Sequence, residues 1–394
     1  MREAQLIARL ADRFDIELVA VTKDLDKDRR GLRQASALGV RAQLFHATPV
    51  QRVAGPHARR HGSASARRYL WHRSTSGTVR ETRTDVFHVE GHYLMPLLPR
   101  VARRSAVLVE HNVESSLFLQ AACSATVPGP KLMTTLADAA LTRVDERRAW
   151  RTARMVVGVT PEDVDTIADV VGPARVRLVP NGADHLSAGH VSADHLSADH
   201  VVTDPAPTPL PDVPGVPSST AHIIFVGNYA YPPNAHAARE LIGRILPAVR
   251  ERVGAVSLVL VGTDPPHWLR DAAARHPDVT VTGPVSDVVP WLRAARVFVA
   301  PLRMGGGVKV KILEALTLGK AVVTTRIGAQ GLHRLSPGSL VVADDPDEFA
   351  DAVARLLVDD PERVRQEARA LLAARRLPTW DAAAEQLAAC WNEA

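Results

Sequence analysis

Short apolar runs alternate with segments of helical spacing along most of the chain, and many of these runs end in a glycine. In the second half, runs of strand composition end in Gly227, Gly262 and Gly283, and a helix is expected from about Pro232. Strand-like runs in the first half cover 16–22, 85–89, 106–109, 155–159 and 176–180. Glycines at the carboxyl ends of buried strands are typical of parallel, doubly wound sheets. The pattern predicts an α/β protein.

The segment 296–332 carries the most informative pattern. An apolar strand at 297–300 leads into the glycines Gly305–Gly307, and a helical period follows over 308–318. Glycine permits positive φ and a close approach to a ligand, and the free N–H groups at a helix start attract anions. The loop is therefore a candidate phosphate cradle.

Two charged residues follow that loop on one helix face. Lys311 and Glu314 are three positions apart, so a cation lies near the loop and a carboxylate lies one turn deeper. This pair suits a sugar nucleotide, with charge for the diphosphate and an acceptor for ribose hydroxyls. A glycine-rich turn with a solvated Lys and Glu is the alternative. The spacing matches neither a P-loop nor the dinucleotide fingerprint.

Length, cysteine content and apolar runs bear on the number of domains and on the cellular compartment. With 394 residues, the chain is long enough for two domains, each with its own core. Two cysteines, Cys123 and Cys390, provide no disulfide framework or zinc signature. No apolar run reaches the length of a membrane span, and the N-terminus shows no signal-peptide pattern. We expect a cytoplasmic protein.

The positive charge is concentrated in the first half. Residues 1–150 hold 24 Lys and Arg against 15 Asp and Glu, and no acidic residue lies between Arg29 and Arg80. This block predicts either a solvated face or a surface for anionic lipid or an acidic acceptor. Nucleic acid is poorly supported, because only three aromatic side chains in the block could stack on bases.

The segment FVAPLRMGGGVKVKILEALTLGKAVVTTRIGAQGL resembles the donor-site region of group 1 (family 4) glycosyltransferases, which have the two-domain GT-B fold and retain anomeric configuration. The resemblance implies that Glu314 holds the donor ribose. The family's second acidic residue, eight positions earlier, is Gly306 here, so the motif resembles its GGG-containing variant. FVGNYAYPPNA, LVGT, VTGPV and the Trp380 region are also similar to the family.

EHNVES resembles the strand end from which a histidine of these enzymes reaches the transferring centre, so we assign His111 a hydrogen-bonding role on the acceptor or phosphate side. Capping of the following helix is the alternative for His111. We expect His88 to be packed near its strand and leave the role of His92 open. The family's first strand and glycine turn are not found. A misassigned start codon is our expectation, and a fragmentary chain or loss of this element are the alternatives.

Two further motifs point away from metal chemistry. Asp24–Asp28 contains Asp-x-Asp twice, a pattern by which other glycosyltransferases bind a divalent cation, but a solvated loop is favoured here. A histidine recurs every five residues from His185 to His200, followed by a proline-rich run. Because this spacing fits neither a helix face nor a strand face, we predict a disordered spacer, with weak metal binding as the alternative.

These observations together predict two Rossmann-like domains with parallel sheets facing across a cleft. The expected parts are an acceptor-side domain at 1–182, a linker at 183–220, a nucleotide-sugar domain at 221–378 and a helix at 379–394 that packs back across the domains. The expected catalytic residues are His111, Lys311 and Glu314. The acceptor-side residues are His92, His111 and Asn112. The donor-binding residues are Gly227, Asn228, Gly283, Gly305, Gly306, Gly307, Val308, Lys309, Lys311 and Glu314.

The predicted function is that of a retaining, metal-independent glycosyltransferase without a cofactor. Its donor would be a UDP-, GDP- or dTDP-linked sugar, and its acceptor a glycan, a glycolipid precursor or a natural product. Peripheral contact with the inner face of an anionic membrane is compatible with the basic block. Two alternatives remain open: a sugar-nucleotide epimerase of the same fold, and a degenerate, non-catalytic partner protein. The sequence does not identify the base, the sugar, the acceptor or the oligomeric state.

Overall fold

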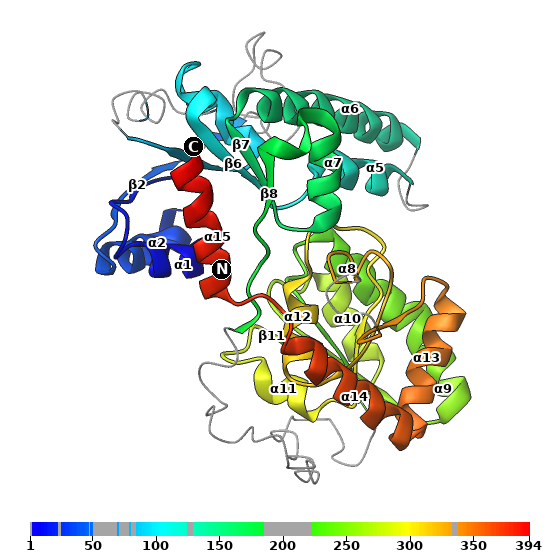
Figure 1. The fold of residues 1–394 in the computed structure, drawn as a ribbon. Helices are drawn as coiled ribbons and strands as arrows, with labels where there is room; N and C mark the ends of the chain where they lie inside the picture. The colour runs from blue at the N-terminus through cyan, green and yellow to red at the C-terminus, as the bar shows by residue number, and fades with distance from the viewer. Residues whose placement is uncertain are drawn as a thin grey trace, which may run out of the picture. The chain divides into compact units, whose positions relative to one another are not determined.

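The computed structural model describes residues 2–22, 25–46, 48–49, 69–70, 79, 84–123, 129–184, 222–332 and 338–394. The chain divides into two compact units (Figure 1). The first comprises residues 1–182 together with 378–394, and the second comprises residues 183–377. The His repeat and the proline-rich run lie almost wholly outside the described residues, as does most of the acid-free block.

The second unit is built on a six-stranded parallel sheet with the order β11-β10-β9-β12-β13-β14. Its strands are β9 (His222–Val226), β10 (Ser257–Val261), β11 (Val279–Gly283), β12 (Val297–Ala300), β13 (Ala321–Thr324) and β14 (Val341–Val342). The strand order reverses direction between β9 and β12. In open α/β sheets, ligands bind outside the carboxyl ends of the strands at such a switch point.

Helices cover this sheet and close its core. They are α8 (Pro232–Glu240), the π-helical turn η8 (Leu241–Ile245), α9 (Leu246–Val253), α10 (His267–Arg275), α11 (Val289–Ala294), α12 (Val310–Thr317), α13 (Pro346–Val358) and α14 (Asp360–Ala374). The central strands are buried on both faces, and Phe225, Phe298 and Phe349 are fully enclosed. This explains why their sequences read as continuous apolar runs.

The first unit holds its strands in separate sheets. β5, β6, β7 and β8 form a parallel sheet in chain order, β1 and β2 form a parallel pair, and β3 and β4 form an antiparallel pair. The bounds are β1 (Glu17–Thr22), β2 (Arg41–His46), β3 (Thr48–Pro49), β4 (Tyr69–Leu70), β5 (Phe87–Glu90), β6 (Ala106–Glu110), β7 (Met155–Gly158) and β8 (Val176–Leu178).

Alternate residues of β6 point to two different cores. Leu108 joins Trp150 and Ile167 on the face covered by α6 and α7, whereas Val107 and Val109 face the opposite way. The helices of this unit are α1 (Arg2–Leu10), α2 (Leu25–Ala37), η3 (His92–Leu97), η4 (Ala102–Ser105), α5 (Glu114–Cys123), α6 (Gly129–Thr152), α7 (Pro161–Val171) and η5 (Pro173–Arg175), with α15 (Trp380–Glu393) at the end of the chain.

The chain's last helix belongs to the first unit. Figure 1 shows α15 beside α1, and both helices pack on the outer face of β6 and β7. Gly182 lies against the start of α15, where a Cβ would clash with the backbone nitrogen of Trp380. The Asn181-Gly182 turn therefore requires glycine at its second position.

The expected strands are confirmed, and one local expectation is wrong. Thr160 accepts a hydrogen bond from the Asp163 amide at 3.0 Å, as its N-cap position predicts. The acidic segment 24–28 was expected to be a solvated loop, but α2 begins at Leu25. Acidic residues favour a helix start because they interact well with its dipole.

Candidate functional site

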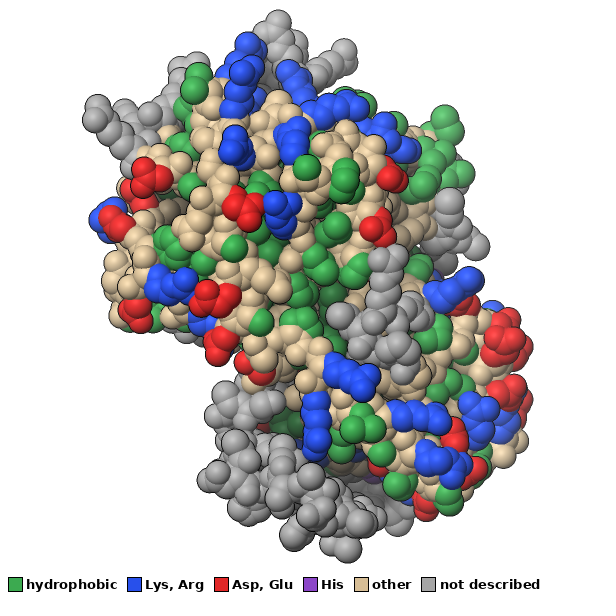
Figure 2. Space-filling view, in the orientation of Figure 1, with side chains coloured by type: hydrophobic (Ala, Val, Ile, Leu, Met, Phe, Trp, Pro, Cys, Tyr) green, Lys and Arg blue, Asp and Glu red, His purple; other side chains and the backbone are tan. Residues whose placement is uncertain are grey.

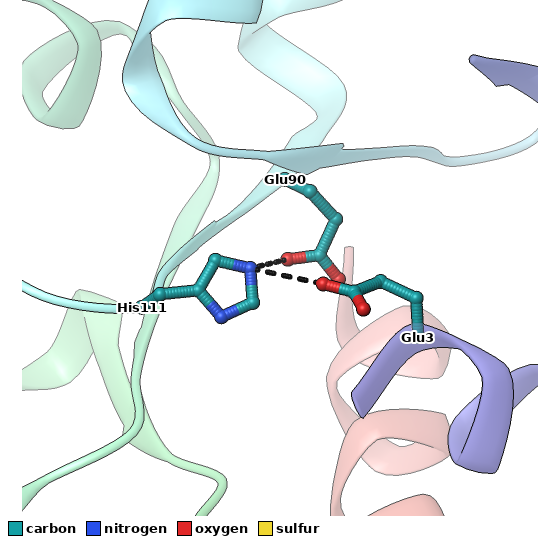
Figure 3. A group of neighbouring side chains, drawn as sticks. All are labelled: Glu3, Glu90 and His111. Atoms are coloured by element: carbon teal, nitrogen blue, oxygen red, sulfur yellow. Dashed lines mark ion pairs between the residues drawn. The ribbon is translucent and has the colours of Figure 1, made fainter. Parts of the chain in front are cut away.

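Three charged side chains meet at the carboxyl ends of β5 and β6 in the first unit. His111 follows β6, Glu90 ends β5, and Glu3 comes from α1 (Figure 3). The Nε2 atom of His111 lies 2.9 Å from Oε2 of Glu90 and 3.3 Å from Oε1 of Glu3. One histidine nitrogen is thus held between two carboxylates.

The other nitrogen of His111 points away from both carboxylates in Figure 3. Nδ1 makes no hydrogen bond to any residue that the structure describes, and the side chain is 37% exposed. The Nδ1–H group can therefore donate to a ligand oxygen while Nε2 stays paired.

A second histidine holds Glu90 from its other side. His88 Nε2 lies 2.7 Å from Oε1 of Glu90, and the indole N–H of Trp391 donates to His88 Nδ1 at 3.0 Å. Because Nδ1 accepts this hydrogen bond, the His88 proton must be on Nε2, from which it donates to Glu90. His88 is a packed structural residue, as its sequence context predicted.

The neighbouring charges determine the protonation of this cluster. Burial alone would lower the pKa of His111, but pairing with Glu3 and Glu90 raises it to about 9. Burial also opposes ionisation of Glu90, yet hydrogen bonds from His88 and His111 and the positive charge of His111 hold the pKa of its carboxyl well below the usual range. At neutral pH the cluster contains an imidazolium between two carboxylates.

The ligand atoms of Glu3, Glu90 and His111 lie within 4.8 Å of one another, close enough to hold a metal ion. A cation would have to displace the His111 proton. It would also face the buried guanidinium of Arg2, whose positive charge interacts with both Glu90 and Glu3. The positive charges already balance the two carboxylates. We therefore assign no metal to this cluster.

Arg2 also connects α1 to the end of the first unit's sheet. Its Nη1 atom donates to Oδ1 of Asn181 at 2.8 Å and to the carbonyl of Pro180 at 3.2 Å. This anchoring places Glu3, the next residue of α1, beside His111.

His92 does not join His111 at the surface. Its side chain is 1% exposed, and its Nδ1 atom lies 3.4 Å from Oε1 of Glu110. Burial alone would lower the pKa of His92, but the Glu110 charge raises it to about 9. Burial of this kind conflicts with the expectation that His92 contacts an acceptor. Asn112 lies beside His111 in sequence, and its Oδ1 atom is buried.

Beneath β6, the cluster around His92 continues into α6. The indole N–H of Trp150 donates to Oε1 of Glu110 at 2.8 Å, and Glu146 accepts from the Ser115 amide at 3.1 Å. Burial raises the pKa of Glu146 to about 7. These groups connect α5, α6 and the sheet, which is a structural role.

A second polar site lies at the switch point of the second unit's sheet. Lys311, near the start of α12, donates from Nζ to Oδ1 of Asn234 at 2.6 Å, and Asn234 Nδ2 donates to the Asn228 carbonyl at 2.8 Å. The ammonium also lies 4.3 Å from the centroid of the Phe225 ring. A cation is thus held between the end of β9 and the helix that follows β12.

Gly227 provides the room for this arrangement. A Cβ at this position would lie 2.8 Å from Nδ2 of Asn234 and 3.0 Å from the Lys311 ammonium. The side chain absent at Gly227 therefore allows Asn234 and Lys311 to meet at the end of β9.

The partners of Lys311 named above are uncharged. Burial and the nearby charge of Lys309 lower the pKa of Lys311 to about 7, against the opposing effect of Glu314. A half-buried ammonium with neutral partners gains from an incoming anion, because the anion supplies the charge that these partners lack.

The glycine loop has the positive φ angles that its composition predicts. φ is 139° at Gly305 and 61° at Gly307, conformations that favour glycine. Lys309 donates to the carbonyls of Gly306 and Gly307 at 3.1 and 2.7 Å, so it stabilises its own loop. Its expected phosphate contact would compete with these bonds.

The remaining donor-side candidates are distributed along the same end of the sheet. Gly283 ends β11 with a φ of 68°. Glu314 is half-buried on α12, one turn after Lys311, while Val308 packs against the core. Asn228 directly follows Gly227 and accepts the Asn234 amide.

Sequence reasoning missed the partners of both cations. Glu90 had a detectable signal, because it ends a buried parallel strand just as Glu110 does. Glu3 had none, since its helix lies far from His111 in sequence. Asn234 was not among the predicted residues, and its contact with Lys311 joins residues 77 positions apart.

Residues 220–359 match the family model for glycosyl transferases of group 1. The phosphatidyl-myo-inositol mannosyltransferase of Mycobacterium leprae is 30% identical over 182 residues, which cover 45% of this chain and 48% of the relative. The corresponding protein of Mycolicibacterium smegmatis is 31% identical over 172 residues, with 42% and 43% covered. The chain therefore spans about half the length of the curated relatives that it matches.

Solved structures extend the likeness in fold across both units. Anabaena HepE in complex with UDP and glucose has a TM-score of 0.67 and 16% identity, covering 100% of this chain and 96% of that one. Sucrose-phosphate synthase from Thermosynechococcus elongatus has a TM-score of 0.60 and 16% identity, with 96% and 98% covered. The chain has the GT-B fold, and the part of its second unit that matches the group 1 model includes the glycine loop, Lys311 and Glu314. None of the described helices is both long and apolar enough to cross a bilayer.

Proposed function

We propose that this protein is a retaining, metal-independent glycosyltransferase that moves a sugar from a nucleotide sugar to an acceptor. The observation that carries the proposal is Lys311, a half-buried cation with uncharged partners at the switch point of a group 1 glycosyltransferase domain. Such a position suits the diphosphate of a nucleotide sugar.

The donor side is assigned to the second unit. Lys311 and the backbone N–H groups at the start of α12 would bind the diphosphate, and the Gly305–Gly307 loop would let it approach closely. Glu314, one turn further, would accept hydrogen bonds from the ribose. These groups stabilise negative charge that grows on the leaving diphosphate, which is electrostatic preorganisation.

The acceptor side is assigned to His111. With Nε2 paired to Glu90 and Glu3, its Nδ1–H group would donate to an oxygen of the acceptor or of a phosphate. Glu90 and Glu3 act through His111 and are positioning residues. We assign no general base.

The proposed step is a displacement on one face of the sugar. The bond between the anomeric carbon and the phosphate oxygen breaks, and a bond to the acceptor oxygen forms on the same face. The acceptor proton passes to an oxygen of the departing diphosphate, so the atoms and charges balance. Lys311 favours this step because it stabilises the diphosphate as the bond breaks.

The nucleotide is the first feature to test. HepE binds UDP and UDP-glucose, which supports a uridine-linked donor for this protein. Thermal unfolding of the full chain should be followed with UDP, GDP, dTDP and ADP in turn. A nucleotide at one hundred times its Kd should stabilise the folded state by about 2.7 kcal/mol. Lys311→Met should abolish the shift.

Turnover separates transfer from other reactions of a nucleotide sugar. The nucleotide identified by unfolding should be used in its sugar-linked forms, each with and without candidate glycan and lipid acceptors. Acceptor-dependent release of the nucleoside diphosphate, with the product's anomeric configuration matching the donor's, supports the proposal. Conversion of the donor alone to an epimer would contradict it.

A further inference from the structure

A basic cavity lies in the first unit at the amino ends of its parallel strands. Its volume is about 620 Å³, and five of the ten lining residues are arginines. The lining residues are Arg104, Arg151, Thr152, Ala153, Arg154, Met155, Ala174, Arg175, Arg177 and Glu393. Because β5, β6, β7 and β8 run parallel, the amino ends of the strands lie on one side of the sheet and their carboxyl ends, with Glu90 and His111, lie on the other.

The topology explains why these arginines meet. Arg104 precedes β6, Arg151 and Arg154 come between the last turn of α6 and β7, and Arg175 and Arg177 flank the start of β8. Each of these three strands therefore has an arginine at or near its amino-terminal end. Because the strands are parallel neighbours, these ends lie side by side.

Three of the arginines make hydrogen bonds, and one of them is Arg154, which donates to the Glu393 carbonyl at 3.4 Å. Arg175 donates to the carbonyls of Trp150 and Arg151 at 3.2 and 3.3 Å and to the carbonyl of Ala153. Its guanidinium therefore caps the C-terminal end of α6. Arg177 pairs with Glu393 at 2.7 Å. The wall of the cavity is thus held in place before any ligand arrives.

The charge around the cavity is not balanced by its own lining. Five guanidinium groups face one lining carboxylate, Glu393, while Arg104 and Arg151 are exposed at the rim. Figure 2 shows Lys and Arg side chains gathered at the top of the view, over the first unit.

We propose that this cavity binds a phosphoryl group. A planar guanidinium offers paired N–H donors that match phosphate oxygens, and several of them around one cavity can bind one multiply charged anion. Nucleic acid fits less well, because the lining contains no aromatic side chain for base stacking. The site is separate from Lys311 and His111, and it does not depend on the proposed transferase activity.

The phosphoryl group could belong to a free phosphorylated compound or to a lipid headgroup, and two assays separate these sources. Isothermal titration of the full chain with sodium pyrophosphate tests the free anion. Sedimentation with phosphatidylcholine vesicles, with and without phosphatidylglycerol, tests the headgroup. Both assays compare the wild type with the double variant Arg104→Gln, Arg151→Gln.

The double variant leaves the fixed wall intact, because it retains Arg175 and Arg177. The matched control, Arg252→Gln with Arg365→Gln, removes the same charge at exposed arginines that lie outside the acid-free block and do not line the cavity. Both variants should keep the wild-type circular dichroism and unfolding temperature. Any pyrophosphate bound at Lys311 would be equal in all three proteins.

The expected result is at least a tenfold weaker pyrophosphate affinity in the Arg104, Arg151 variant and wild-type affinity in the control. If a lipid is the source, binding to phosphatidylglycerol vesicles falls in the same variant and pyrophosphate competes with it. If the source is a free compound, only the titration changes. Equal binding by all three proteins in both assays would overturn the proposal, and so would an equal loss in the control.

Discussion

His111 and Lys311 occupy comparable places in the two units but have opposite surroundings. Each lies beyond the carboxyl end of a parallel strand, where open α/β sheets bind ligands. His111 lies between the carboxylates of Glu90 and Glu3, whereas Lys311 contacts the amide oxygen of Asn234 and the ring of Phe225. The same topological rule places a basic group at each position, and the neighbours determine its charge.

The difference has a chemical meaning. Pairing with the carboxylates raises the pKa of His111 to about 9, so its proton is held and its outer N–H can donate. Burial and the charge of Lys309 lower the pKa of Lys311 to about 7, so its charge is stabilised fully only when an anion binds. The charge of His111 is neutralised by carboxylates of the protein itself, whereas the charge of Lys311 is neutralised only by a bound anion.

Removal of Lys311 should have the largest effect. We expect Lys311→Met to lower kcat/KM by about 10²–10³-fold, because the leaving diphosphate loses a preorganised charge. Lys309→Met is the matched control, and it should cost much less, since Lys309 donates to carbonyls of its own loop. Steady-state kinetics with the identified donor measures both. Equal losses of kcat/KM in the two variants would contradict the assignment of the diphosphate to Lys311 and not to Lys309.

Substitution of His111 should have the next largest effect. We expect His111→Gln to lower kcat about 10²-fold, which is within the range for the loss of one preorganised hydrogen-bond donor. Glu385→Gln, an exposed change on α15, is the control and should leave kcat unchanged. Wild-type kcat in His111→Gln would contradict the role given to this residue.

Glu90→Gln should have a smaller effect that depends on pH. The substitution removes a carboxylate that raises the pKa of His111, so this pKa should fall from about 9 toward its ordinary value of about 6.5. We expect kcat of the variant to decline between about pH 6.5 and 8, while the wild type declines only near pH 9. A kcat that falls by the same factor at every pH would indicate a merely structural role for Glu90.

Nucleotide binding should be accompanied by proton uptake at Lys311. At pH 8 the free Lys311 is mostly neutral, because its pKa is about 7, and a bound diphosphate would raise this pKa. We expect an uptake approaching one proton at pH 8 and little uptake at pH 6, where the group is already charged. Titration calorimetry in buffers of different ionisation enthalpy measures it, and Lys311→Met should abolish the uptake. Proton release at pH 8 would contradict this account.

The smallest expected effect is on stability. The folded pKa of His111 is raised above its unfolded value of about 6.5, so its stabilising contribution is complete below that pH and is lost as the pH rises through about 9. The contribution should be about 1 kcal/mol, because partial exposure screens the ion pairs. Thermal unfolding of His111→Gln should approach the wild type at pH 9.5 and fall below it at pH 6. An unchanged difference between these pH values would contradict the assignment.

Much of the fold could be read from local sequence patterns. The strands β9, β10, β11 and β12 and the glycines that follow them depend on neighbouring residues, so the sequence alone is enough to predict them. The same local rules selected His111 and Lys311 as candidates. They did not predict the burial of His92, because the residue types after β5 do not indicate whether the side chain of His92 points into the core or toward solvent.

Only the tertiary structure determined the partners of these two residues. Trp391 donates to His88 across 303 positions, Glu3 reaches His111 from the N-terminal helix α1, and Asn234 contacts Lys311 from a different βα unit. These contacts form because α1 and α15 pack together and because β9 and β12 pair at the switch point. The sequence by itself determined which residues could carry charge at the strand ends. The tertiary structure determined that His111 is paired with carboxylates and that Lys311 contacts uncharged groups. The protonation of each side chain depends on atoms a few ångströms away, and folding brings those atoms from distant parts of the sequence.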